Sequence, residues 1–116
     1  MNERGHQRER DVRRQLEEDG WVVFRAAGSL GIADLVALRD GERPRLIEVK
    51  STAGGPYERF GPMAREDLIY IANKAGADAW LCWWPPRRDA HWIAADRWPK
   101  HAVTDTAQTA EWYGNV

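Results

Sequence analysis

The sequence has very little cysteine, no long hydrophobic run and no excess of charge of either sign. Its single cysteine, Cys82, excludes an internal disulfide and lies in an apolar stretch, which predicts an inert core residue. No segment approaches the roughly 20 apolar residues that span a bilayer, and the polar start MNERGHQRER is unlike a signal peptide. We therefore expect a cytoplasmic protein of a cell or a virus, without membrane contact.

The balance of charges gives little support for a nucleic-acid partner. The 116 residues carry 17 Lys and Arg against 18 Asp and Glu, for a net charge of −1. A strongly basic total would have favoured DNA or RNA binding, but carboxylates that bind a cation leave a more positive surface than this count suggests. Lysine is scarce among the basic residues, and one of the few lysines, Lys50, follows an apolar run.

Hydrophobic periodicity predicts an α/β domain with a mixed sheet and helices packed on it. Helical spacing and terminal glycines favour helices over residues 4–19 and 63–76. Short apolar runs predict five strands, at residues 21–26, 33–38, 45–51, 79–84 and 91–96. The domain is expected to span residues 1–99. Residues 100–116 are expected to form a C-terminal tail, either docked on the domain or at a dimer interface.

Three charged residues interrupt the hairpin that residues 33–51 are expected to form. Glu48 and Lys50 are two positions apart on one strand, so their side chains share a face. In an antiparallel hairpin, the residue numbers of each facing pair add up to the same value. Asp34, on the preceding strand, shares the face of Glu48 and Lys50 only if this sum is even. A plain two-residue turn at Asp40 and Gly41 gives an odd value. A connection of three or five residues centred near 41–42, or a bulge, gives an even one. Pro44 favours the longer connection because it cannot donate to a sheet ladder.

With an even register, two carboxylates and an ammonium meet at one edge of the sheet. Such carboxylates repel one another, and a hard divalent cation such as Mg²⁺ removes that cost. Glu9 lies on the same helical stripe as Val12 and Leu16 and is predicted to face inward as well. The alternative is an ordinary solvated strand face, on which a Glu-x-Lys pattern is common.

The pattern resembles the PD-(D/E)XK nuclease superfamily, with Asp34 followed by Glu48-Val49-Lys50. The wider run GHQRERDVRRQLEEDGWVVFRAAGSLGIADLVAL and then LIEVKS is similar to the archaeal-type Holliday junction resolvase family, which also occurs in phages. The likeness covers residues 5–98. It implies a restriction-endonuclease-like fold, with a five-stranded mixed sheet flanked by helices in the order αβββαββ.

The resemblance also implies roles for individual residues. Glu9, Asp34, Glu48 and Lys50 would form the catalytic set. Mg²⁺, with Mn²⁺ as a substitute, would be held by the three carboxylates and the backbone carbonyl of Val49. DNA contacts would come from Arg10, Arg25 and Ser29. Arg59 and Arg65, the main positive groups of the long loop and the second helix, are further candidates for DNA contacts.

The activity implied is that of a homodimeric endonuclease that binds a four-way DNA junction and nicks two opposed strands, leaving 5′-phosphates. Two other functions stay open at this point. One is a different PD-(D/E)XK nuclease, of a restriction or repair type. The other is a module of the same fold that binds DNA without cutting it.

Seven tryptophans are many for 116 residues. In the run 79–84, Trp80, Cys82 and Trp84 fall on one face of a strand, and Leu81 and Trp83 on the other. Base stacking at the junction, a dimer interface and core packing each account for such a strand. We favour core packing combined with a dimer interface.

Overall fold

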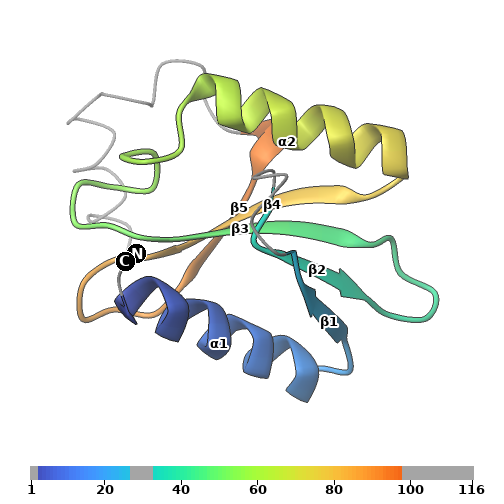
Figure 1. The fold of residues 1–116 in the computed structure, drawn as a ribbon, viewed down its shortest axis with the longest axis horizontal. Coiled ribbons are helices and arrows are strands. Elements are labelled where there is room, and N and C mark those ends of the chain that lie inside the picture. Colours follow the sequence, from blue (N-terminus) through green and yellow to red (C-terminus); the bar gives the residue numbers. More distant parts are fainter. Residues whose placement is uncertain (1–2, 27–32, 98–116) are drawn as a thin grey trace.

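The computed structural model describes residues 3–26 and 33–97, which form three layers with a sheet in the middle (Figure 1). The elements are α1 (Glu3–Glu18), β1 (Val22–Arg25), β2 (Leu35–Leu38), β3 (Arg45–Ser51), α2 (Pro62–Ala75), β4 (Asp78–Trp84), β5 (His91–Ala94) and the short 3₁₀ helix η1 (Ala95–Arg97). This order confirms the predicted αβββαββ arrangement. The predicted tail and Ser29 lie outside the described residues.

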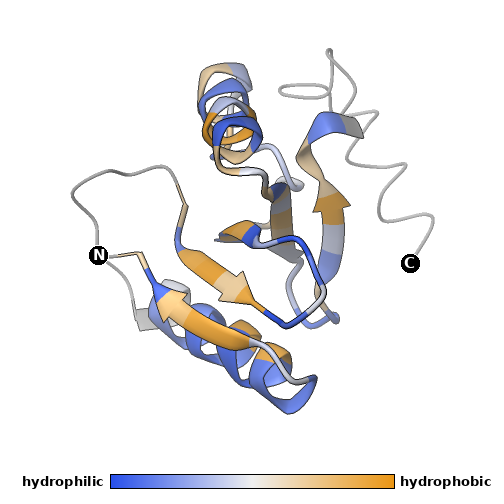
Figure 2. Cartoon of the chain, turned by 90° about the vertical axis from the view of Figure 1, so that its right-hand side faces the viewer, coloured by the Kyte–Doolittle hydropathy of each residue, from blue (hydrophilic) through white to orange (hydrophobic). Residues whose placement is uncertain are grey.

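α1 and α2 lie on opposite faces of the sheet (Figure 1). α1 turns its apolar residues toward the strands and its polar ones outward (Figure 2). Val12 and Leu16 are buried, and the helix gives way to β1 at Gly20, whose φ of +89° suits a residue without a side chain. α2 is followed by the cap residue Gly76, whose φ of +66° is also in the left-handed region. Its backbone N–H donates to the carbonyl oxygens of Ala72 and Asn73.

The sheet is mixed, as predicted. Its strands lie in the order β1-β2-β3-β4-β5; β3 and β4 are parallel, and every other neighbouring pair is antiparallel. In the β2–β3 pair, Leu35 faces Ile47 and Ala37 faces Arg45, so the residue numbers of each pair add up to 82. This even register, centred on Gly41, confirms the longer connection predicted from the sequence.

The core consists of two clusters separated by the sheet. Between α1 and the sheet lie the side chains of Val12, Leu35, Ile47, Val49 and Trp84, among others. Between α2 and the sheet lie Leu46, Phe60, Leu68 and Leu81, among others. The alternation along β3 therefore directs Glu48 and Lys50 to the α2 face, toward the end of the sheet.

Two strand boundaries differ by two residues from the sequence prediction, and the others agree to within one. β2 begins at Leu35 rather than at residue 33, because the Asp34 side chain occupies the place that a longer β2 would take beside β3: its Oδ2 accepts a hydrogen bond from the Val49 backbone N–H at 2.7 Å. β5 ends at Ala94 rather than at residue 96, because Ala95 begins η1, where its carbonyl accepts a hydrogen bond from Arg65 Nε at 3.0 Å.

Candidate active site

The charged residues of the hairpin come together just before β2 begins, beside the later residues of β3. Lys50 Nζ lies 3.3 Å from Glu48 Oε1, and the side chains are only 25% and 12% exposed. The Asp34 carboxylate lies beside them, bonded to the backbone of Val49. Two carboxylates and an ammonium therefore share one partly buried end of the sheet, as the even register requires.

Glu48 is the most strongly perturbed carboxyl group of this site. Burial raises its pKa, the negative charge of Asp34 raises it further, and Lys50 acts in the opposite direction; the result is a pKa of about 8. A carboxyl group with so high a pKa has too little positive charge near it in the protein to stabilise its ionised form. A divalent cation would supply that partner, and two carboxylates with waters and phosphate oxygens form a donor set that Mg²⁺ commonly accepts.

Glu9 approaches from the other side, on α1. Its pKa is raised by burial and by the charge of Asp34, while Arg25 and His6 lower it. Its Oε1 lies 3.4 Å from Arg25 Nε, so its direct partner is the arginine at the end of β1. Arg25 Nη2 also lies 3.3 Å from His6 Nε2; because a guanidinium can only donate, the histidine nitrogen accepts this bond.

Glu9, His6 and Arg25 border an open hollow of about 250 Å³, whose other lining residues are Arg10, Arg13 and Leu35. Three guanidinium groups around one carboxylate make this hollow electropositive. The negative charge of Asp34 raises the pKa of Glu9 on the rim of this hollow, so the hollow lies near Asp34. The arrangement suits a phosphate of a nucleic-acid backbone lying next to the two carboxylates.

The structure does not bring all predicted ligands into one cluster. Within residues 3–26 and 33–97, no three side chains of His, Cys, Asp or Glu are close enough together to hold a metal ion. The two carboxylates of the pair, Asp34 and Glu48, are supported by the geometry. Direct ligation by Glu9 and by the Val49 carbonyl stays a prediction.

The predicted DNA-contacting arginines fall into two groups. Arg10 and Arg25 line the same hollow, and Arg10 is exposed, with Nη2 donating to Gln7 Oε1 at 2.8 Å. Arg59 is exposed on the loop that follows β3, with Nε 3.9 Å from Glu58 Oε2. Arg65 is half-buried and its Nε donates to the carbonyl of Ala95, so it also joins α2 to η1. Contact of these residues with DNA stays a prediction.

His6 and Arg13 also border the site; from the sequence, His6 is interpreted as a surface histidine rather than a ligand, and Arg13 does not stand out. A signal was present in the helical spacing, since both are three or four residues from Glu9 and so lie on its face of α1. Glu9 stands out in the sequence because it continues the apolar stripe, and that stripe does not indicate which polar residues flank it.

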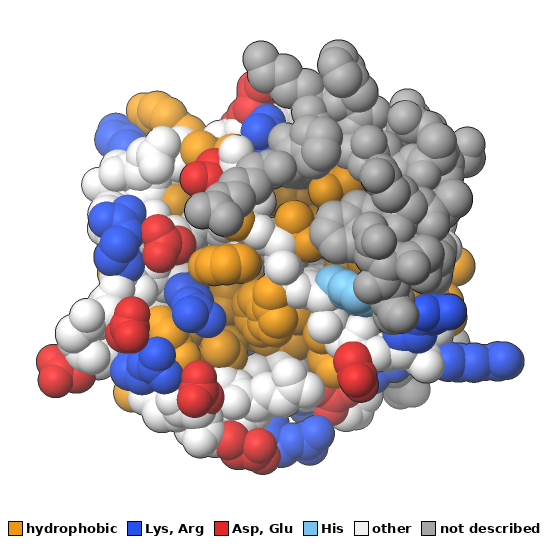
Figure 3. All heavy atoms as spheres, turned by 180° about the vertical axis from the view of Figure 1, so that it is seen from behind, with side chains coloured by type: hydrophobic (Ala, Val, Ile, Leu, Met, Phe, Trp, Pro, Cys, Tyr) orange, Lys and Arg blue, Asp and Glu red, His pale blue; other side chains and the backbone are white. Residues whose placement is uncertain are grey.

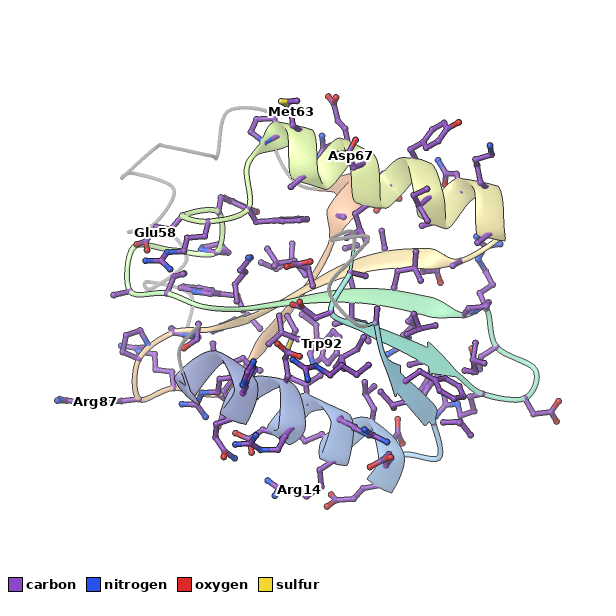
Figure 4. The ribbon with its side chains drawn as sticks, viewed as in Figure 1. Arg14, Glu58, Met63, Asp67, Arg87 and Trp92 are labelled. Atoms are coloured by element: carbon purple, nitrogen blue, oxygen red, sulfur yellow. The ribbon has the colours of Figure 1, made fainter. Side chains whose placement is uncertain are left out.

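The surface of the described residues is not uniformly basic. On the face seen in Figure 3, basic and acidic side chains of the described residues are interspersed around a hydrophobic area. From α1, Arg14 projects away from the sheet, whereas Trp92 of β5 points toward the α1 side of the sheet (Figure 4). The hollow lined by Arg10, Arg13 and Arg25 is therefore a local basic feature of a molecule whose charges are otherwise mixed.

Comparison with protein families matches residues 1–108 to the family described as archaeal Holliday junction resolvase (Hjc). The chain belongs to this family. Membership identifies the resolvase as a nuclease, an endodeoxyribonuclease, and confirms the resemblance predicted from its Glu-Arg helix and Glu-Val-Lys strand. A search of curated proteins gave no match.

A solved structure supports the same assignment. The resolvase is similar to Hjc of Archaeoglobus fulgidus, described as a Holliday junction resolvase from an archaeal hyperthermophile. The TM-score is 0.68 at 28% identity, over 79% of this chain and 78% of the other. The shared architecture of five strands and two helices confirms the predicted fold. None of the described helices has the length and apolar character needed to cross a membrane.

Proposed function

We propose that this resolvase is a Mg²⁺-dependent endonuclease that cuts four-way DNA junctions by paired, symmetric nicks and leaves 5′-phosphates. The observation that carries the proposal is the meeting of Asp34, Glu48 and Lys50 at one end of the sheet, with the pKa of Glu48 raised to about 8 by burial and by Asp34. A structural ion pair alone does not need a second carboxylate beside it, whereas a cation-binding nuclease site does.

Asp34 and Glu48 would hold the Mg²⁺ ion, and Mn²⁺ could replace it. When bound, the ion would lower the pKa of a water molecule and balance the charge that builds on the phosphate. In the reaction, a water oxygen forms a bond to phosphorus and the bond from phosphorus to the 3′-oxygen breaks. The products are a 5′-phosphate and a 3′-hydroxyl.

The protein's own side chains would orient this reaction. Lys50, held 3.3 Å from Glu48, is placed to donate hydrogen bonds to the attacking water or to a phosphate oxygen. Arg25 and Arg10 line the neighbouring hollow and would hold the DNA backbone by charge-assisted hydrogen bonds. Glu9 keeps Arg25 in place through their ion pair and would contribute to the metal site directly or through water.

We also propose that the resolvase acts as a homodimer. A four-way junction offers two equivalent strands, and a two-fold pair of subunits offers two equivalent sites. Two of the three tryptophans of β4 belong to the core: Trp83 and Trp84 are 0% and 7% exposed, whereas Trp80 is only partly buried. The use of this strand as an interface stays a prediction.

A different apolar surface is available for dimer formation. Val22 and Phe24 of β1 and Leu38 of β2 are 58%, 54% and 40% exposed. Val22 faces Leu38 and Phe24 faces Val36 in the sheet register, so these side chains form one continuous patch on the face that α1 does not cover. We propose this patch, rather than β4, as part of the contact between subunits.

The experiment that tests the proposed function compares DNA substrates. The protein is incubated with Mg²⁺ and equal amounts of a four-way junction, a linear duplex of the same arms and a single strand. We expect paired symmetric nicks in the junction alone. Equal cutting of the linear duplex would favour a general PD-(D/E)XK nuclease, and binding without any cutting would contradict the catalytic proposal.

A further inference from the structure

Among the described residues, the later part of β3, which carries Glu48 and Lys50, is paired with another strand on one side only. The β2–β3 register ends with Leu35 opposite Ile47, so the later residues of β3 have no β2 partner in it. On that side, the carboxylate of Asp34 accepts the Val49 N–H. On the other side, β3 stays paired with β4 through Ser51. The position of Lys50 therefore depends chiefly on β4 and on the turn that comes after Ser51.

Trp83 is the residue of β4 that faces Lys50 in the parallel register. Paired residues of neighbouring strands point to the same face and lie about 5 Å apart, so the indole lies beside the lysine on the α2 side. Trp83 is fully buried. Its ring also lies against His91, with centroids 5.5 Å apart.

The indole N–H of Trp83 makes a contact that an aliphatic residue could not make. It donates to both the backbone carbonyl and the side-chain Oγ1 of Thr52, each at 3.1 Å. The Thr52 hydroxyl in turn donates to the Gly55 carbonyl at 2.5 Å. Thr52 is 7% exposed, and Gly55 has a φ of +107°, so this buried turn has a defined backbone shape.

We infer that Trp83 and Thr52 are positioning residues for Lys50. Together they fix the chain two residues after the lysine, at the point where β3 leaves the sheet. Glu48 lies two residues before Lys50 and Thr52 two residues after it. When both are fixed, Lys50 Nζ stays beside the carboxylate pair. Without the indole–threonine bonds, the end of β3 is free to fray, and the lysine spends less time where it can act. This positioning role rests on the proposed function of Lys50 in strand cutting.

The test separates cutting from binding and from folding. Thr52→Val keeps the shape of the side chain but removes the hydroxyl, and Thr52→Ser restores it. Trp83→Phe keeps an aromatic ring but removes the N–H donor. Single-turnover cutting of a four-way junction in Mg²⁺ is measured for each variant, together with the Kd for the junction and the Mg²⁺ concentration that gives half-maximal rate.

We expect Thr52→Val and Trp83→Phe to cut about five- to tenfold more slowly, as the loss of a buried hydrogen bond would produce. The Kd for the junction and the Mg²⁺ dependence should stay at the wild-type values, and Thr52→Ser should recover most of the rate. The matched control is Trp84→Phe, on the same strand but on the α1 face. It should leave the rate within twofold of the wild type.

Several outcomes would overturn the inference. Wild-type rates in Thr52→Val would show that the hydroxyl does not position the lysine. An equal loss in Trp84→Phe, or a weaker junction Kd in step with the rate, would assign the effect to general loosening of the core. A wild-type protein that does not cut the junction would instead refute the proposed function, so the two failures are distinguishable. If Trp83→Phe does not fold, the pair of threonine variants still decides.

Discussion

Replacing Glu48 by glutamine should stabilise the metal-free resolvase at high pH. The pKa of Glu48 is raised from 4.5 to about 8, first by burial and then by the charge of Asp34. A group whose pKa is higher in the folded state contributes stability below its unfolded pKa, and that contribution is lost as the pH rises toward the folded pKa. The wild-type protein therefore loses stability between pH 4.5 and 8, and a neutral glutamine does not.

The size of this effect is set by the pKa difference. Each pKa unit corresponds to about 1.4 kcal/mol, so the full difference amounts to about 5 kcal/mol above pH 8. Part of this gain is offset, because Lys50 loses its partner and the buried amide needs hydrogen bonds of its own. We expect Glu48→Gln to raise the free energy of unfolding by about 2 kcal/mol at pH 9.

The assay is urea unfolding in the presence of EDTA at pH 4.5, 7 and 9. The difference between Glu48→Gln and the wild type should grow with pH up to about 8 and then level off. Glu66→Gln, at an exposed position on α2, is the matched control and should show no such trend. A difference that is constant over this range, or that favours the wild type at pH 9, would refute the reasoning about this site.

Three further predictions concern activity and assembly. Asp34→Asn should lower junction cutting by at least about a thousandfold without weakening junction binding, because it removes a proposed metal ligand but no phosphate contact; cutting rates and gel-shift Kd values in Mg²⁺ check this. Lys50→Ala should lower the cutting rate by about a hundredfold or more at an unchanged Kd, measured under single turnover. Phe24→Glu should turn the dimer into monomers by light scattering while the circular dichroism spectrum stays that of the wild type, because a charge on the apolar patch would be buried without a partner. A variant that stays dimeric would exclude this patch.

The hairpin of the candidate active site could be predicted from the sequence because hydrophobic period and strand register are local properties. Asp34, Glu48 and Lys50 were selected as charges in apolar strands, and Pro44 indicated the longer connection that brings them to one face. The β2–β3 register, with Gly41 at its centre, confirms that choice. The helix carrying Glu9 was also predictable, since its apolar stripe and terminal glycine are both visible in the residues.

The parts that could not be predicted depend on contacts between distant segments. The ion pair of Glu9 with Arg25 and the hydrogen bond from Trp83 to Thr52 join residues 16 and 31 positions apart, and no periodicity reports such pairs. The tryptophan-rich strand was expected to combine core and interface. Its place between β3 and β5, with a helix on each face of the sheet, puts Trp83 and Trp84 in the core, and its use as an interface stays a prediction.

The most direct test of the central claim is a junction-cutting assay with and without divalent cation. A junction labelled on each of its four strands is incubated with wild-type protein in Mg²⁺ or in EDTA, and with Asp34→Asn in Mg²⁺. We predict that only the wild type with Mg²⁺ gives nicks, at symmetric positions on two opposed strands and with 5′-phosphate ends. Equal cutting in EDTA or by Asp34→Asn would contradict the assignment of the carboxylate pair as a catalytic metal site.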